Sequence, residues 1–213
     1  MLYKEMLLSR RLVIAQGVAG AVFGGAAQAA STSSFAGMTW LNEPTSVTIE
    51  GDRCLVGAKP GTDFWRATYT GTVSDNGHFL FRPMQSGFKI TARIQGDYLS
   101  RYDQAGIMVR QSPEHWMKCG TEFFAKRRTA SIVVTHDYSD WSFGPNPTET
   151  GAVWWRVERR KNSLDISLSA DGDRFQLTRS CYFAPESPAD VGLYCCSPTG
   201  QGFTATFDQL QIS

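Results

Sequence analysis

The chain has 213 residues, of which 42% are hydrophobic and 19% are charged. This length suits one domain with or without a processed segment, and the apolar content is sufficient for a substantial core. The formal net charge is +1, from 21 Lys and Arg against 20 Asp and Glu. This balance argues against nucleic acid as a partner, because nucleic-acid binders gather lysine and arginine against phosphates. The basic clusters at 126–128 and 159–161 fall where exposed turns between strands are expected.

Residues 1–37 differ in composition from the rest of the chain. The stretch from Leu12 to Ala27 carries no charge, and Ala27-Gln28-Ala29 has the small-x-small form of a signal-peptidase site. Because Ser9–Ile14 resembles a twin-arginine export signal, residues 1–37 are predicted to be a disordered or helical signal peptide and linker of a periplasmic or secreted protein. The apolar run is too short and too rich in glycine for stable membrane insertion. The alternative is translation from Met38, which would give a cytoplasmic protein.

From about residue 46 onward, apolar and polar residues alternate with the period of two that is typical of half-buried β-strands. The clearest run is Phe88–Gln95, which is apolar at every even position, and Val153–Arg159 alternates in the same way. Ala105–Arg110 is apolar at both parities, as a central strand would be. About a dozen such runs, without an amphipathic helix, predict an all-β, antiparallel two-sheet β-sandwich of the jelly-roll kind over residues 38–213.

The middle of the chain carries the densest pattern of strands and aromatic residues. Trp116–Ala125 and Ala130–Thr135 are predicted to pair as a hairpin around the basic turn between them. A polar and aromatic segment, Thr135–Ser142, follows the hairpin, and Gly144–Pro147 is predicted to be a loop.

The five cysteines show neither a C-x-x-C pair nor a Cys/His cluster at zinc spacing. Neighbouring residues of a strand point to opposite faces, so Cys195 and Cys196 are not expected to serve one metal together. Cys119 is expected to be a small apolar filler of the core. We therefore expect free structural thiols, with a disulfide or a reactive thiol as the alternatives. No cofactor and no metal are predicted; calcium held by Asp137 and Asp140 is the weaker alternative.

Several motifs together resemble those of a known family. They are Tyr102–Arg110, Trp116–Phe123, Tyr138–Ser142, Ser169–Gly172 and Gly192–Pro198. In this order they are similar to an uncharacterised bacterial and fungal family with a concanavalin A-like lectin/glucanase fold, whose fungal member is named as a regulator of enolase. The resemblance covers nearly everything after Met38. It implies a β-sandwich with a concave face, and it implies no established activity.

A carbohydrate or glycan-like ligand on the concave face is the leading functional hypothesis. Sandwich domains recognise sugars with an aromatic ring for the sugar face and polar side chains for the hydroxyls, and Tyr102 and Trp141 are candidates for stacking. The candidates for hydrogen bonding are Asp103, Arg110, Glu122, His136 and Arg156. Each has a structural alternative. Arg110, Glu122 and Arg156 could form a buried charge network, and Trp141 could belong to the core.

Two other functions remain open at this stage. A glycoside hydrolase would use Glu122 and a second carboxylate, for instance Asp103, since retaining hydrolysis needs two carboxyl groups roughly 5 Å apart. The glucanase pattern Glu-x-Asp-x-x-Glu is absent, and His136-Asp137 is more simply explained as a hydrogen-bonded loop pair than as an acid/base or metal pair. The remaining hypothesis is a protein-interaction or regulatory domain with a protein partner. The sequence by itself indicates no reaction.

Overall fold

The computed structural model describes residues 33–85, 87–184 and 188–213. The predicted export signal lies outside these described residues. Throughout the described ranges no helix is long and apolar enough to cross a membrane.

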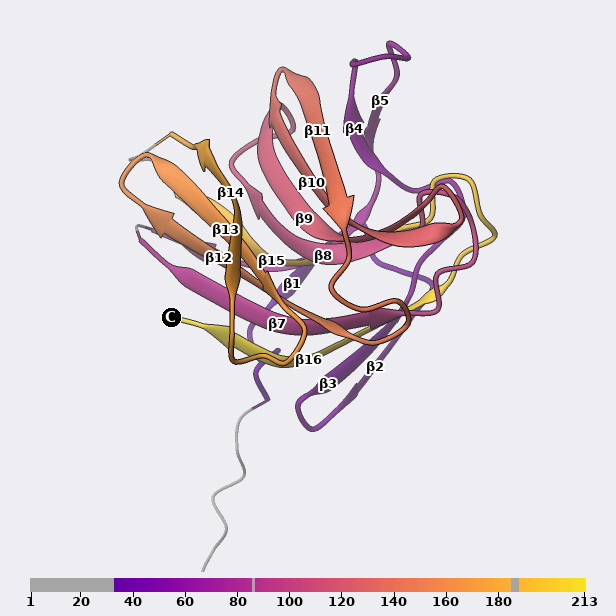
Figure 1. The fold of residues 1–213 in the computed structure, drawn as a ribbon, viewed down its shortest axis with the longest axis horizontal. Coiled ribbons are helices and arrows are strands. Elements are labelled where there is room, and N and C mark those ends of the chain that lie inside the picture. Colours follow the sequence, from indigo (N-terminus) through magenta and orange to yellow (C-terminus); the bar gives the residue numbers. More distant parts are fainter. Residues whose placement is uncertain (1–32, 86, 185–187) are drawn as a thin grey trace, which may run out of the picture. The chain divides into compact units, whose positions relative to one another are not determined.

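Two seven-stranded antiparallel sheets form a sandwich (Figure 1). Sheet I has the spatial order β1 (Thr39–Leu41), β6 (His78–Met84), β15 (Ala189–Cys196), β8 (Gln104–Arg110), β9 (His115–Phe124), β10 (Arg127–His136) and β11 (Tyr138–Pro145). Sheet II has the order β14 (Gln176–Tyr182), β13 (Ser163–Ser169), β12 (Val153–Arg160), β7 (Lys89–Gly96), β16 (Thr204–Ile212), β3 (Arg53–Gly57) and β2 (Ser46–Glu50). The predicted all-β sandwich is confirmed.

The apolar residues that alternate with polar ones along each strand form the core between the two sheets. In β7 the even residues Ile90, Ala92 and Ile94 are buried, while the odd residues between them are partly exposed. Val153, Trp155 and Val157 of β12 pack into the same core. Each of these strands therefore buries one side and leaves the other to solvent, as the pattern predicts.

Sheet I differs because its central strands are buried on both sides. Every residue of β8 is buried. Ile107 and Val109 join the core between the sheets, whereas Met108 joins a second apolar cluster on the face that points away from sheet II. We call this face of sheet I its outward face. Cys195 and Cys196 confirm the opposite directions expected of neighbours, because one lies in each cluster.

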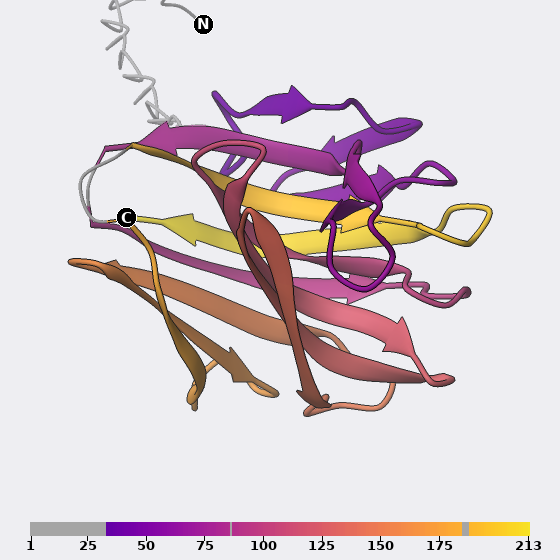
Figure 2. The same cartoon turned by 90° about the horizontal axis from the view of Figure 1, so that it is seen from above.

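A short hairpin explains the burial of the outward face. It consists of β4 (Phe64–Arg66) and β5 (Val73–Asp75), which pair only with each other. Phe64 is fully buried in the second cluster, edge-on to Trp116 at a ring distance of 6.3 Å. Figure 1 shows the hairpin on the side of sheet I opposite β7 and β16, and in Figure 2 the hairpin crosses in front of the strands. The hairpin therefore acts as a partial cover over sheet I.

The core starts earlier than the predicted domain boundary at residue 38. Phe35, which the sequence assigns to the linker, is 4% exposed and packs in the core between the sheets. A turn holds it there, with Ala36 N donating to Ser33 O at 2.9 Å. Gly144 and Pro145, predicted to be part of a loop, are instead the last residues of β11.

The five cysteines are free thiols. Burial raises the pKa of Cys54 to about 11 and raises the pKa of Cys119 and Cys195 further. A thiol in this state is a poor nucleophile, since the thiolate is the reactive form. The cysteines behave as apolar fillers, as the sequence indicates.

Candidate functional site

The outward face of sheet I holds a pocket of about 820 Å³. Its floor comes from β8, β9 and β10, one wall from β11 and the loop before β8, and the other wall from the β4–β5 hairpin. The lining residues include Trp65, Tyr69, Arg101, Tyr102, Gln104, Lys118, Glu122, Phe124, Val133, Ser139 and Trp141. A volume of this size is typical of a site for a small molecule or a short oligomer.

The floor carries two buried charged groups on one strand. Lys118 and Glu122 both belong to β9 and lie on its outward face, because residues four apart on a strand share a face. Gly120 stands between them and pairs with Gly106 of β8. A Cβ atom on Gly120 would lie 2.1 Å from the carbonyl oxygen of Ala105, so the close approach of β8 and β9 requires glycine here.

Lys118 is tied to the start of the hairpin. Its Nζ donates to the carbonyl oxygen of Phe64 at 2.6 Å and forms an ion pair with Asp63 Oδ1 at 3.2 Å. The ammonium also lies 5.7 Å from the ring centres of Trp116 and Tyr194, which suits a cation–π contact. Because Lys118 is only 2% exposed, these contacts take the place of its hydration shell.

Glu122 has a different environment. Burial raises the pKa of its carboxyl above the usual value, and hydrogen bonding from Ser131 together with the charge of Lys118 offsets part of this. No ion pair joins Glu122 to a lysine, arginine or histidine among the described residues. Its carboxyl is therefore a buried acid that faces the pocket without a cation of its own.

Aromatic rings form the wall next to Glu122. Tyr102 stacks on Phe124 at 5.8 Å, and Trp141 meets Phe124 edge-on at 5.0 Å. The Trp141 indole Nε1 donates to Ser131 Oγ at 2.9 Å, which fixes the orientation of the ring. Arg101 also lines the pocket and lies against this wall, with its guanidinium carbon 4.6 Å from the centre of the Tyr102 ring.

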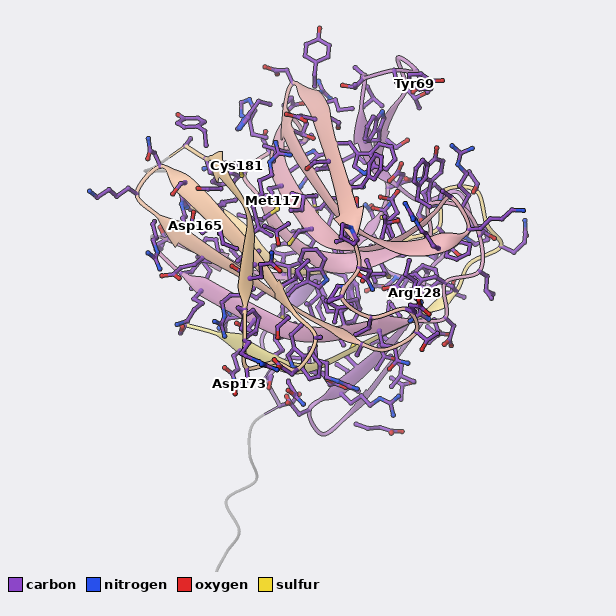
Figure 3. The ribbon with its side chains drawn as sticks, viewed as in Figure 1. Tyr69, Met117, Arg128, Asp165, Asp173 and Cys181 are labelled. Atoms are coloured by element: carbon purple, nitrogen blue, oxygen red, sulfur yellow. The ribbon has the colours of Figure 1, made fainter. Side chains whose placement is uncertain are left out.

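The opposite wall is the β4–β5 hairpin. Trp65 Nε1 donates to Thr68 O at 2.9 Å within the hairpin, and Arg66 N donates to Ser139 Oγ of β11 at 2.9 Å. Tyr69 lies at the hairpin tip with its side chain fully exposed (Figure 3). Ala67 and Tyr69 both have positive φ, which is costly for residues with a side chain. The tip thus presents an unpacked tyrosine beside the pocket.

Of the residues chosen from the sequence, the structure brings Tyr102, Glu122 and Trp141 together at the pocket. Asp103 follows Tyr102 but is fully buried. Its carboxylate accepts hydrogen bonds from Ser100 N at 2.7 Å and Ser197 Oγ at 2.6 Å. Asp103 therefore shapes the loop that presents Tyr102, and it does not reach the pocket.

Three further candidates also lie elsewhere. Arg110 makes a bidentate ion pair with Asp75 at 2.8 and 2.9 Å, which anchors the hairpin. Arg156 belongs to β12 of sheet II and stacks on Phe175 at 3.5 Å. His136 is exposed at the end of β10, 5.7 Å from the His115 ring. The structure does not join Arg110, Glu122 and Arg156 into the charge network considered as an alternative, since Arg156 lies on the other sheet.

The sequence reasoning missed Asp63, Gln104 and Lys118. One signal was available for Lys118: it alternates with Trp116, Gly120 and Glu122 on a strand whose other side is mostly apolar, so it shares their face. Asp63 and Gln104 carried no comparable signal in the sequence. Asp63 reaches the sheet because the hairpin that follows it packs against strands far along the chain. Among the described residues, no group of three or more His, Cys, Asp or Glu side chains could hold a metal ion.

The fold and the pocket define a class, the concanavalin A-like jelly-roll sandwich with a pocket on one sheet. Within it, the model of the family described as "Protein of unknown function (DUF1349)" matches residues 40–213. The chain belongs to this family.

The relatives support this assignment. The Saccharomyces cerevisiae protein named "Regulation of enolase protein 1" is 38% identical over 175 residues, which cover 82% of this chain and 88% of that protein. A crystal structure of a functionally unknown protein from Saccharomyces cerevisiae has a TM-score of 0.81 and 37% identity, covering 85% of this chain and 98% of that one.

More distant structures share the fold alone. The carbohydrate binding module CBM66 from Bacillus subtilis has a TM-score of 0.54 and 13% identity, covering 83% of this chain and 97% of that one. The GH43 protein BlXynB from Bacillus licheniformis has a TM-score of 0.63 and 14% identity, covering 80% of this chain and 35% of that one.

Proposed function

We propose that the pocket on sheet I binds a saccharide. The observation that carries the proposal is the combination of an aromatic wall, Tyr102 and Trp141, with buried polar groups on the floor, Lys118 and Glu122, around 820 Å³ of space. Sugars present an apolar face that suits an aromatic ring and hydroxyl groups that need directed hydrogen-bond partners.

The polar groups are held in place before any ligand arrives. Lys118 is fixed by Phe64 O and Asp63, and Trp141 is fixed by Ser131. Such preorganisation reduces the entropy that binding would otherwise cost. A ligand in this pocket would meet rigid partners on the floor and an adaptable residue, Tyr69, at the hairpin tip.

Two fold neighbours lend support by analogy. CBM66 is named as a carbohydrate binding module and BlXynB as a GH43 protein. Because the identities are only 13% and 14%, the analogy concerns the scaffold, and the choice of ligand depends on the side chains of this chain.

The test is a thermal-shift screen of the protein against a panel of saccharides, with Trp141→Ala beside the parent. We expect at least one saccharide to raise the melting temperature of the parent and to leave that of the variant unchanged. Trp154→Ala is the matched control. Trp154 lies on β12 of sheet II, hydrogen-bonded to Gln209, so its removal should leave the ligand-induced shift intact. A panel without any shift in the parent would contradict the proposal.

A second candidate function, glycan hydrolysis, is favoured by one observation. Glu122 is a buried carboxyl whose pKa is raised, which suits a proton donor, and Asp63 supplies a second carboxyl to the same pocket. Any saccharide that binds would be incubated with the parent and with Glu122→Gln. Release of reducing ends by the parent and its loss in the variant would establish a hydrolase; binding without turnover would leave a binding domain.

We also propose that residues 1–37 direct export through the twin-arginine route, on the basis of their composition. Fractionation of a bacterial host that expresses the full chain provides the test. Export that stops when Arg10 and Arg11 are both replaced by lysine would support the proposal. Cytoplasmic protein that begins at Met38 would contradict it.

A further inference from the structure

The floor of the pocket has an unequal distribution of charge. Lys118 is compensated, because Asp63 Oδ1 lies 3.2 Å and Phe64 O 2.6 Å from its ammonium. Asp140 at the rim is paired with Arg179 at 3.2 Å. Glu122 is the buried charged group of this floor that has no opposite charge in an ion pair among the described residues.

Burying a carboxylate without a cation is costly, and hydrogen bonds from neutral groups compensate only in part. Glu122 is 6% exposed, and hydrogen bonding from the neutral Ser131 hydroxyl offsets only part of the effect of burial on its pKa. A ligand that brings a positive charge to this point would relieve the cost, whereas a neutral hydroxyl would leave the carboxyl protonated or uncompensated. A cation next to Glu122 would therefore stabilise its ionised carboxylate.

The wall beside Glu122 has the same preference. Tyr102, Phe124 and Trp141 gather within ring distances of 5.0 to 6.4 Å. Aromatic faces carry partial negative charge and attract cations. A cation already lies against this wall, since the Arg101 guanidinium is 4.6 Å from the ring centre of Tyr102 and 5.4 Å from that of Phe124.

A negatively charged ligand would meet the opposite situation. Asp63, Glu122 and Asp140 all line the pocket, and only Lys118 and Arg101 oppose them. Lys118 is paired with Asp63, whereas Arg101 is exposed and lies against the Tyr102 ring. Carboxyl groups therefore outnumber the cations that line this pocket, which favours a cationic ligand over an acidic sugar.

We infer that the ligand of this pocket is an amino sugar whose protonated amine pairs with Glu122 beside the aromatic wall. This inference rests on the proposed saccharide binding and narrows it to a chemical class. The sugar ring would supply the apolar face for Trp141 or Tyr102, and the amine would supply the charge that Glu122 lacks.

The test compares three tetrasaccharides that differ only in the group on carbon 2. They are the β-1,4-linked tetramers of glucosamine, N-acetylglucosamine and glucose, titrated by calorimetry into the full-length protein at several pH values from mildly acidic to neutral, so that both the amine and the Glu122 carboxyl pass through their charged forms. We expect the glucosamine tetramer to bind about tenfold more tightly than the other two, since an ion pair in a desolvated site exceeds a neutral hydrogen bond.

Glu122→Gln tests whether this carboxyl is responsible. The variant should lose the preference for the amine and should bind the glucose tetramer within about twofold of the parent. Glu158→Gln, at a partly exposed position of β12 in sheet II, is the matched control and should keep the preference. If Glu122→Gln does not fold, the comparison of the three tetramers on the parent still decides the question.

The outcomes separate the two proposals. Equal affinity for the three tetramers, or binding only of other neutral saccharides, would contradict the pairing of an amine with Glu122. The proposal that the pocket binds a saccharide would still hold. Tetramethylammonium that binds as tightly as the glucosamine tetramer would show that the pocket takes organic cations, and it would overturn both. Failure of every saccharide to bind would also overturn both.

Discussion

The outward faces of sheet I and sheet II both carry charged side chains, but these side chains have different surroundings. On sheet II, Arg93 pairs with Asp208 at 2.7 Å and Arg156 stacks on Phe175 at 3.5 Å, and the side chains remain partly exposed. On sheet I, Lys118 and Glu122 are 2% and 6% exposed.

The difference comes from what covers each face. The β4–β5 hairpin lies over sheet I, and its Phe64 packs among the outward side chains of the sheet. On the other side of the pocket, Trp141 of β11 forms part of the wall. The outward side chains of β12 stay partly exposed even though Phe175 stacks on one of them, Arg156. A buried charge needs partners or a ligand, whereas an exposed charge has water. The covered face is therefore where function is expected, and the following substitutions test that contrast.

The largest effect is expected from Gly120→Ala. A methyl group at this position meets the backbone of Ala105 and Gly106 at 2.1 to 2.8 Å, so β8 and β9 would have to separate. We expect a loss of about 3 kcal/mol in the free energy of unfolding, measured with denaturant. Gly144→Ala is the control, since no atom lies within 4 Å of its added methyl group. Equal stability of the two variants would contradict the close approach.

A smaller loss is expected from Lys118→Met. The substitution removes the donor to Phe64 O and the partner of Asp63, and we expect the free energy of unfolding to fall by about 2 kcal/mol. Arg160→Met breaks an exposed ion pair with Glu158 on sheet II and should leave the stability nearly unchanged. If both variants unfold at the parent's denaturant concentration, Lys118 does not anchor the hairpin.

The pH dependence of stability should have opposite signs on the two faces. Burial raises the pKa of Glu122 above its ordinary value of 4.5, so the folded state holds a proton that the unfolded state has lost. Stability then decreases as pH rises from about 4.5 toward the raised pKa, and Glu122→Gln should become progressively more stable than the parent over that window.

Glu158 provides the contrast, because the hydrogen bond from Arg160 lowers the pKa of its carboxyl. Its contribution is present above the ordinary value and is lost as pH falls through the lowered pKa. Glu158→Gln should therefore match the parent in acid and fall slightly below it at neutral pH. Denaturant unfolding of the three proteins from acid to neutral pH measures both slopes. If the stability difference between variant and parent changed with pH in the same direction for Glu122→Gln and Glu158→Gln, the contrast between the two faces would be contradicted.

The sequence predicts the strands better than it predicts the site. Phe88–Gln95 and Val153–Arg159 identify their buried side because period two relates neighbours on one strand. The same rule correctly predicted that Arg156 and Trp155 point to different sides of their strand. It could not show that β12 belongs to a different sheet from β9, the strand that carries Glu122. Pairing between strands distant in sequence determines that, and no local pattern encodes it.

Tyr102, Glu122 and Trp141 were identifiable because they lie within one continuous stretch of sequence, formed by the loop before β8 and the neighbouring strands β8 to β11. Asp63 and Tyr69 reach the pocket through a hairpin that contacts residues more than fifty positions later, such as Lys118 and Ser139. Such a contact depends on the side chains that fill the space between the segments, and these become apparent only in three dimensions.

The most direct test of the account is an amide NMR titration with the saccharide that raises the melting temperature most. We predict that chemical shifts will change for residues of β8 to β11 and for the hairpin tip at 67–72, and that β12 and β13 will remain unaffected. Shifts confined to sheet II, or shifts on sheet I that persist unchanged in Trp141→Ala, would contradict the claim that the covered face is the binding site.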